Sequence, residues 1–329
     1  MIGWDDVYKL IASMFPLYFA LILGYGSVKW WHLIKPDHCG AINQLNCYFI
    51  MPLFTFDFAS RINPYKMNFR FLVADGISKS IVLVVILLWA KFSSKGNYRW
   101  SITSFSLSAF NNTLVVGVPL MHAMYGPLGE NLVIQASILQ LTIYMIILLV
   151  MYAFWSVNES LDQEVGPNDQ LETDLEGNPN EDSMTRRPSL LIVLKVVGIK
   201  LAKNPNTYAS VLAVSWAFVA NRWDLKLPSI IYGSVEIMSR GGAGLAMYSM
   251  GLVMALQKKI IDCGLNLTAF AMLLRFVVAP TMIAVSSLAV GLRGDVLCMA
   301  IMQAAIPPSI ASFVFAKEYE LHANVLSTA

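Results

Sequence analysis

Residues 111–119 read NNTLVVGVP and lie inside an apolar run at 101–124. A second stretch, QAAIPPS at 303–309, lies inside the apolar run 296–316. Proline within a helix removes a backbone hydrogen bond and clashes with the preceding turn, at a cost of about 3 kcal/mol. In lipid, such an opened backbone is tolerated only where it lines a cavity or packs against protein. The two stretches therefore predict two broken helices inside a membrane.

The composition indicates that much of the chain faces lipid. Of the 329 residues, 57% are hydrophobic and 13% are charged, whereas soluble domains average about 25% charged residues. This composition excludes a disordered chain, a collagen, a coiled coil and a disulfide-stapled secreted domain. The net charge of +2 is too small for a nucleic-acid partner. We therefore predict an all-α polytopic membrane protein in contact with the lipid bilayer.

A bilayer core requires about 20 mainly apolar residues per helix, and this length predicts nine spans. The first is long and lacks a basic segment before it, so we interpret it as a retained span and not as a signal peptide. The predicted spans are 7–27, 41–60, 70–90, 101–124, 132–155, 206–221, 229–256, 266–290 and 296–316.

One long polar stretch, 156–189, separates the spans into two groups and reads as a disordered linker. Residues 190–203 space three lysines among aliphatic residues, which predicts an amphipathic helix at the membrane interface. Lysines and arginines in the short loops favour a non-cytosolic N-terminus and a cytosolic linker, by about two to one.

An internal repeat emerges when the numbering is shifted by about 195, because the two broken stretches then coincide. The predicted units are a first transmembrane repeat (1–155), a short cytosolic loop (156–189) and a second repeat (190–329). Five spans per repeat would reverse the second half, which gives two inverted five-helix repeats with crossed broken helices. The same register places a tenth span after Ala329, so we expect either an incomplete repeat or a fragment.

Two crossed broken helices would point their N-terminal ends at one place, where the helix dipoles attract an anion. The alternative is a pair of ordinary proline kinks; the matched placement of the stretches favours a binding site. Neither stretch contains an ionisable residue, whereas ion-coupled carriers usually place one at such a crossing. An organic anion moved by membrane potential alone is therefore the expected cargo.

Further polar residues lie close to or within the spans. Asn204 and Pro205 precede the sixth span, where Asn206 could reach a cavity and Asn204 could instead be a helix cap. Asp75 and Lys79 share one face of the third span at i, i+4, as a cavity-lining pair or as a purely structural one. Other intramembrane ionisable residues are Asp57, Glu236, Arg240 and Arg275.

Motifs of the common enzyme classes are missing from the sequence. There is no phosphate-binding GxxxxGK[ST], no HExxH and no GxSxG. The four histidines are scattered near span ends, which argues against a metal centre. We expect a protein that is not an enzyme and that has no cofactor.

The chain resembles the plant PIN-FORMED auxin efflux carriers over essentially its whole length, and five stretches carry this resemblance. The short loop resembles that of the short-loop, endoplasmic-reticulum members of the family. The five stretches are 16–18 (PLY), 112–120 (NTLVVGVPL), 204–208 (NPNTY), 313–319 (FVFAKEY) and 326–329 (LSTA).

The resemblance implies elevator-type export of the indole-3-acetate anion from the cytosol, by a homodimer of ten-span subunits similar in architecture to bile-acid symporters. The expected location is the endoplasmic reticulum membrane, with the plasma membrane as the alternative. The resemblance places the site residues of the family on particular positions of this chain. Substrate-binding positions are Asn112, Asn206, Asn111, Ile50 and Pro307; crossover prolines are Pro119 and Pro307, and Pro308 follows in the same crossover; the supporting ion pair is Asp75 with Lys79.

The sequence departs from the family pattern at Asn111, where many members have proline, and at Pro308, where a glutamine is usual. Two rival functions stay open. One is a sodium- or proton-coupled carrier of another organic anion, and the other is a truncated partner that regulates complete carriers without transporting.

Overall fold

The computed structural model describes residues 4–93, 96–164, 190–257 and 263–328. These residues form helices joined by short connections, and the part of the chain described contains no β-strand, only one isolated bridge. The prediction of an all-α protein is confirmed. Most of the predicted linker, 165–189, lies outside the described residues. Its first nine residues were wrongly predicted as disordered, because the preceding helix continues to Glu164 without a proline or glycine to end it.

The described residues of the first half form seven α-helices and four shorter turns. They are α1 (Trp4–Lys29), α2 (Pro36–Leu45), η1 (Asn46–Ile50), α3 (Met51–Ser60), η2 (Pro64–Lys66), α4 (Phe69–Phe92), α5 (Tyr98–Ala109), η3 (Thr113–Gly117), α6 (Val118–Leu139), η4 (Gln140–Tyr144) and α7 (Met145–Glu164). The turns η1, η3 and η4 are π-helical and continue directly into the next α-helix.

The second half begins with the helix expected at 190–203. Its elements are α8 (Leu190–Lys203), α9 (Pro205–Trp223), α10 (Ser229–Arg240), α11 (Gly242–Leu256), α12 (Leu265–Leu273), the π-turn η5 (Leu274–Val278), α13 (Ala279–Ala289), α14 (Asp295–Ala304), α15 (Ile310–Glu318) and α16 (Ala323–Thr328).

Four helical segments of the described chain are long and apolar enough to cross a membrane. They are 7–29, 69–92, 113–157 and 265–289. The other predicted spans are interrupted or less apolar: a break follows Ala109, Gly241 separates α10 from α11, and a second break follows Ala304. Several apolar helices in an all-helical chain confirm a polytopic membrane protein.

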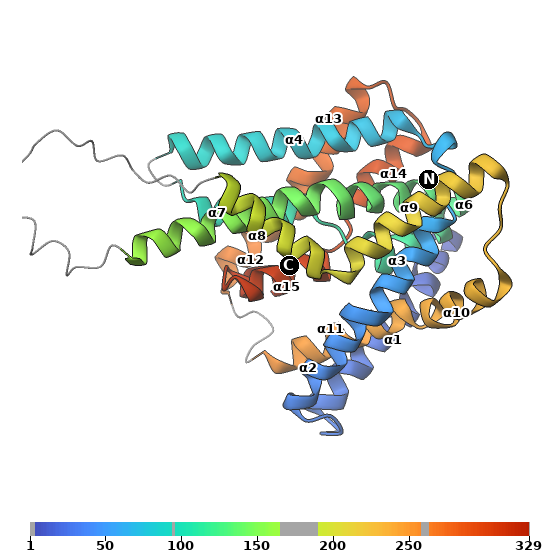
Figure 1. Ribbon diagram of the computed structural model, residues 1–329, viewed down its shortest axis with the longest axis horizontal. Coiled ribbons are helices and arrows are strands. Elements are labelled where there is room, and N and C mark those ends of the chain that lie inside the picture. Colours follow the sequence, from blue (N-terminus) through green and yellow to red (C-terminus); the bar gives the residue numbers. More distant parts are fainter. Residues whose placement is uncertain (1–3, 94–95, 165–189, 258–262, 329) are drawn as a thin grey trace, which may run out of the picture.

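The helices pack as two bundles (Figure 1). The first bundle consists of α1, α2, α3, α9, α10 and α11, in which α1 lies along α11 and α3 along α9. The second bundle consists of the remaining helices, in which α4 lies along α13 and α5 packs between α4 and α7. Each bundle therefore combines helices from both halves of the sequence.

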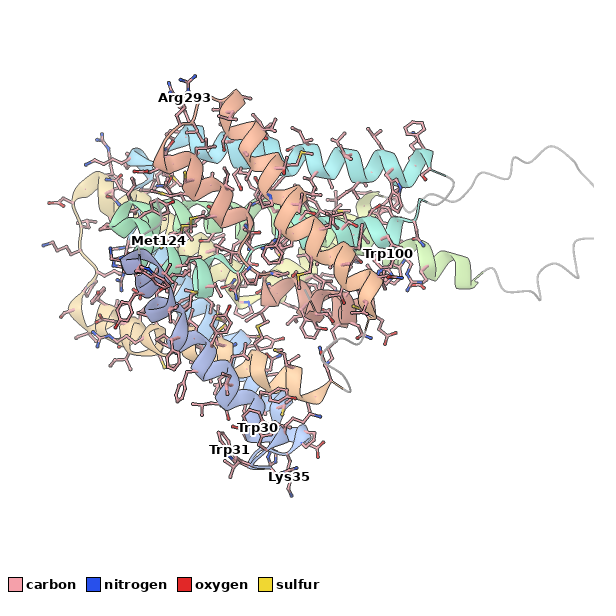
Figure 2. All side chains as sticks on the ribbon, turned by 180° about the vertical axis from the view of Figure 1, so that it is seen from behind. Trp30, Trp31, Lys35, Trp100, Met124 and Arg293 are labelled. Carbon is pink, nitrogen blue, oxygen red and sulfur yellow. The ribbon has the colours of Figure 1, made fainter. Side chains whose placement is uncertain are left out.

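Labelled side chains identify the two ends of the second bundle in Figure 2. Trp100, near the start of α5, lies at one end, and Met124 and Arg293 lie at the opposite end. Trp30 and Trp31 follow α1 and are about half exposed. Tryptophans at helix ends are typical of the interface between lipid and water.

Three of the four π-turns are followed by a proline two residues later: Pro52 after η1, Pro119 after η3 and Pro280 after η5. Proline cannot donate a hydrogen bond, and its ring crowds the carbonyl four residues before it. A π-turn relieves this conflict by widening the helix, and such turns are frequent at functional sites.

Helices α1 and α11 approach each other through two glycines. A Cβ atom at Gly251 would lie 2.1 Å from the Leu21 carbonyl oxygen, and one at Gly24 would lie 2.1 Å from the Tyr248 carbonyl oxygen. Because both obstacles are backbone atoms, no side-chain rotation can make room. Small residues let membrane helices pack this closely.

We expect Gly251→Ala to separate α1 from α11 and to lower the free energy of unfolding by about 1–3 kcal/mol, the usual range for overpacking. The measurement is the thermal midpoint of the detergent-solubilised protein. Gly244→Ala, on the same helix with nothing within 4 Å of the new Cβ, is the matched control and should not destabilise. Equal midpoints for both variants would contradict the close packing.

Candidate functional site

The two broken helices cross through extended segments that pair in antiparallel fashion. The Asn112 N–H donates to the Pro307 carbonyl at 2.8 Å, and the Ser309 N–H donates to the Phe110 carbonyl at 3.1 Å. Asn111 and Pro308 form the bridge between them. Asn112 and Pro307 are the positions that the shift of 195 residues makes equivalent. The backbone groups opened by the two breaks therefore satisfy each other.

Side-chain amides secure the crossing from both sides. Gln140, in the π-turn η4, accepts from the Asn111 N–H at 3.0 Å and donates to its carbonyl at 2.7 Å. The Asn111 side chain donates to the Gln303 carbonyl at 2.8 Å, near the end of α14. Asn111 thus supplies both a backbone N–H and a side-chain amide to the crossing. Gln140 was not singled out from sequence, although it is polar within an apolar run.

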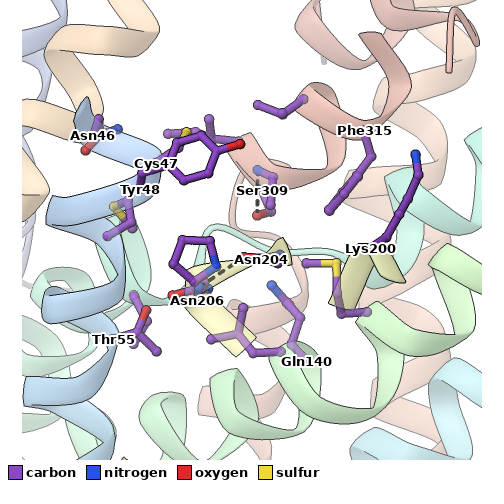
Figure 3. A pocket seen from close by; sticks show the side chains of 18 of the residues that line it. Asn46, Cys47, Tyr48, Thr55, Gln140, Lys200, Asn204, Asn206, Ser309 and Phe315 are labelled. Carbon is purple, nitrogen blue, oxygen red and sulfur yellow. Dashed lines mark hydrogen bonds between the residues drawn. The ribbon is translucent and has the colours of Figure 1, made fainter. Parts of the chain in front are cut away.

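A cavity of about 550 Å³ lies beside the crossing, between the two bundles. This volume is within the usual range of small-molecule sites, and the lining is mostly apolar with a few polar groups. Side chains from both bundles and from the crossing surround it (Figure 3). Its polar lining includes Asn46, Thr55, Asn111, Asn112, Thr113, Gln140, Lys200, Lys203, Asn204, Asn206, Ser309 and Glu318.

The helix that starts at Thr113 presents an uncapped N-terminus to this cavity. Asn112 occupies the cap position, but its side chain makes no cap hydrogen bond and none to any other described residue. The N–H groups of Thr113 and Leu114 likewise have no partner in the described chain. Asn112 is 7% exposed. An unbonded carboxamide and free N–H groups at a helix N-terminus are the arrangement that binds carboxylates and phosphates.

Two further helix N-termini reach the same cavity. Helix α15 begins after Ser309, whose hydroxyl accepts from the Ala311 N–H at 3.3 Å. Helix α9 begins at Pro205, and its cap Asn204 accepts from the Asn206 N–H at 3.0 Å. Asn204 is therefore a helix cap, while the Asn206 side chain lines the cavity (Figure 3). Each N-terminus contributes about half a positive charge.

Several buried oxygens of the lining lack hydrogen-bond partners. They are the side-chain oxygens of Asn46, Thr55, Asn111 and Asn206. A buried polar atom left without a partner costs about 1–3 kcal/mol. Such atoms around one cavity indicate a space in which water or a ligand completes the hydrogen bonds.

The edge of the cavity formed by α8 and α15 carries the ionisable residues of the lining. Lys200 pairs with Glu318 at 2.6 Å and lies 3.7 Å from the centre of the Tyr319 ring. Burial alone would lower the pKa of Lys200, but the bonds to Glu318 and Tyr319 outweigh it and raise the pKa. Lys200 therefore stays charged at neutral pH. Lys200 and Lys203 both line the cavity. Neither was singled out as a site residue, because both precede the predicted sixth span in the sequence.

Two positions expected to bind the substrate do not line the cavity in the structure. Ile50 is buried at the end of η1 and does not line the cavity, which receives Cys47, Tyr48 and Met51 instead. The π-turn inserts an extra residue per turn, so the helix face is rotated relative to a regular helix. Pro307 contributes its carbonyl to the crossing and does not line the cavity either.

Of the prolines assigned to the crossover, Pro307 and Pro308 lie in the segment between α14 and α15. Pro119 lies within α6, beyond the π-turn η3. The chain is extended at Phe110 and breaks there, nine residues before Pro119. Pro119 widens the helix into the π-turn η3 without breaking it.

Asp75 and Lys79 form a buried ion pair at 2.9 Å on α4. The Lys79 ammonium also lies 4.2 Å from the centre of the Tyr144 ring. Neither charged residue lines the cavity, so the geometry does not support the cavity-lining alternative. Tyr144 belongs to the same π-turn as Gln140, and the ion pair therefore packs behind the turn that holds the crossing.

Among the other ionisable residues, Asp57 links the two halves of the sequence. Its carboxylate accepts from Arg61 on its own helix at 2.9 Å and from the Ser239 hydroxyl on α10 at 2.7 Å. Glu236 and Arg240 pair with each other near the surface. Within the described chain, no group of three histidines, cysteines or acidic residues is arranged to hold a metal ion.

Comparison with known proteins gives matches along the whole chain. Residues 9–329 match the family model described as membrane transport protein. The chain is 51% identical over its full length to auxin efflux carrier component 5 of Arabidopsis thaliana, covering 93% of that protein. It is 48% identical to the probable auxin efflux carrier component 5a of Oryza sativa subsp. japonica and 35% identical to component 8 of Arabidopsis thaliana, with full coverage of this chain and 94% of each relative.

Proposed function

Since the chain belongs to the auxin efflux carriers of the membrane transport protein family, we propose that it carries the indole-3-acetate anion out of the cytosol. The relatives are named as auxin efflux carriers, and the cavity has the chemistry that this cargo requires. An apolar lining suits an indole ring, and helix N-termini suit a carboxylate.

The observation that carries the proposal is the uncapped N-terminus at Asn112. Its carboxamide and the free N–H groups of Thr113 and Leu114 can donate to one carboxylate without a fixed positive charge at the point of contact. Asn206 reaches the same cavity from α9. Binding by neutral donors and partial charges is weaker than binding by a buried arginine, which suits a carrier that must also release its cargo.

We further propose uniport driven by the membrane potential. Glu318 is the one carboxylate of the cavity lining among the described residues, and it is paired with Lys200 at the edge. A proton-coupled carrier usually places a titratable group next to its cargo. The cavity offers amides and hydroxyls at that place.

The position of the cavity between two bundles supports an elevator mechanism. In this mechanism the second bundle, which contains both broken helices, moves past the first bundle with the bound anion. The hydrogen bond between the repeat-equivalent residues Asn112 and Pro307 supports two inverted repeats. We propose a homodimer in the endoplasmic reticulum membrane, with a non-cytosolic N-terminus, that moves auxin into the lumen.

One observation favours a second candidate function. The unpartnered oxygens of Asn46, Thr55 and Asn206 are hard donors of the kind that bind metal cations. A sodium ion held by these oxygens would make the protein a sodium-coupled carrier of an organic anion.

The test is uptake of labelled indole-3-acetate into proteoliposomes that contain the chain. The potential is clamped with valinomycin and potassium gradients, and sodium is replaced by choline. For uniport, the anion should accumulate on the positive side by about 50-fold at 100 mV, since one charge is worth about 2.3 kcal/mol. Replacing sodium should change nothing.

Each other outcome has a defined meaning. Uptake that requires sodium would favour the coupled carrier. Uptake that ignores the potential would exclude uniport of an anion. Uptake of benzoate but not of indole-3-acetate would remove auxin as the cargo and retain an anion carrier.

A further inference from the structure

Arg275 is among the largest fully buried side chains of the described residues, with 0% of its surface exposed. It lies in the π-turn η5 between α12 and α13, outside the cavity lining. One guanidinium nitrogen donates to the Leu107 carbonyl at 2.8 Å, and the other terminal nitrogen donates to the Ile306 carbonyl. The side chain therefore joins α5 to the segment after α14, where the two helices break.

A buried guanidinium normally requires a carboxylate, because removal of a charge from water is costly. No carboxylate of the described residues forms an ion pair with Arg275, and its Nε has no partner. Arginine keeps its charge in proteins. The positive charge must therefore be balanced by something other than an acidic side chain.

The balance comes from helix ends. Leu107 is in the last turn of α5, and Ile306 lies two residues after the last residue of α14. Each helix C-terminus carries about half a negative charge, so the two ends together offset about one positive charge. Both helices end at the crossing, where Leu107 and Ile306 are buried at 0% and 2% exposure, so water screens these charges only weakly.

The same crossing separates these negative ends from the positive ends at Thr113 and Ile310, which face the cavity. Without Arg275, the C-terminal ends of α5 and α14 would oppose the positive field of those N-termini. With Arg275, the N-terminal ends are left to act on the cavity. The guanidinium also fixes the spacing of the two breaks, because its two donors are held in a rigid fork.

We propose that Arg275 is a positioning residue that joins the two broken helices and gives the cavity its preference for an anion over a neutral ligand. The inference rests on the proposed function, because it deepens the account of the same site. It concerns charge selectivity, which differs from the identity of the cargo.

The experiment measures dissociation constants of the purified protein for indole-3-acetate and for the neutral analogue indole-3-acetamide. The quantity of interest is the ratio of the two constants. We expect Arg275→Gln to reduce the preference for the anion at least tenfold while affinity for the amide changes less than threefold. Arg275→Lys, which keeps the charge, should retain the preference within threefold and lower the thermal midpoint. Arg293→Gln, at an exposed arginine (Figure 2), is the matched control.

A parallel loss of affinity for both ligands in Arg275→Gln would reduce Arg275 to a structural role and overturn the proposal. An unchanged ratio in that variant would overturn it as well. If Arg275→Gln fails to fold, Arg275→Lys decides: loss of anion preference despite the retained charge would refute the electrostatic role. Benzoate and benzamide serve as a second pair of anionic and neutral ligands. If the unmodified chain does not bind indole-3-acetate, auxin is refuted as the cargo, and the role of Arg275 is then decided from the second pair.

Discussion

Asn112→Asp is expected to abolish binding of indole-3-acetate, with a loss of affinity of more than about a hundredfold. The loss has two parts. A hydrogen bond to a charged group is worth about 1.5–3 kcal/mol, and this part alone predicts a loss of about 10- to 100-fold for Asn112→Ala. The aspartate adds repulsion between two carboxylates, which is worth about 4 kcal/mol at 4 Å near a protein surface.

The measurement is calorimetric binding of indole-3-acetate to the purified variants. Asn97→Asp is the matched control, because Asn97 is exposed and caps α5 as a hydrogen-bond acceptor, a role that aspartate fills equally well. This control should bind like the unmodified protein. If Asn112→Asp retained the affinity, the carboxylate would have to bind elsewhere in the cavity, with Lys203 as the next position to test.

Lys79→Met is expected to lower the free energy of unfolding by about 3–5 kcal/mol, the cost of leaving one partner of a buried ion pair without the other. Both side chains are nearly fully buried, at 7% and 6% exposure, so water cannot solvate the remaining carboxylate of Asp75. The expected result is a large fall of the thermal midpoint and loosening of the π-turn that contains Tyr144.

The double variant Asp75→Leu with Lys79→Met separates loss of the pair from exposure of a lone charge. Because buried ion pairs can often be replaced by apolar residues at little cost, the double variant should recover most of the stability. Arg240→Met is the matched control, since it breaks an exposed i, i+4 pair with Glu236 and should cost about 0.5 kcal/mol or less. Equal midpoints for Lys79→Met and this control would show that the buried pair is unimportant for stability.

The sequence predicted the broken helices because two proline-containing stretches occur at matched places in two apolar runs. The exact point of the first break was not predictable from Pro119. The chain breaks at Phe110 because its carbonyl and the Asn112 N–H find partners at Ser309 and Pro307, nearly 200 residues away. Local sequence cannot contain that information.

The candidate site was also predicted only in part from the sequence. Asn112 and Asn206 were expected in the cavity and lie in its lining, whereas Ile50 was expected there and does not. The cause is the π-turn at 46–50, whose extra residue changes which side chains of this helix face the cavity. Lys200 and Arg275 were not predicted as site residues for two other reasons. Lys200 reaches the cavity from α8, which lies outside the predicted spans. Arg275 donates hydrogen bonds to α5 and to the segment after α14, and α5 is distant from it in sequence.

The sequence by itself determined that this is an all-helical membrane protein, that its apolar runs are broken at matched places, and that Asp75 and Lys79 share one helix face at i, i+4. These properties depend on composition and on neighbours within a turn or two. Only the tertiary structure decided which backbone groups close the two breaks, which faces line the cavity, and where the charge of Arg275 is balanced. Those outcomes depend on hydrogen bonds and dipoles between segments that meet only when both bundles have packed.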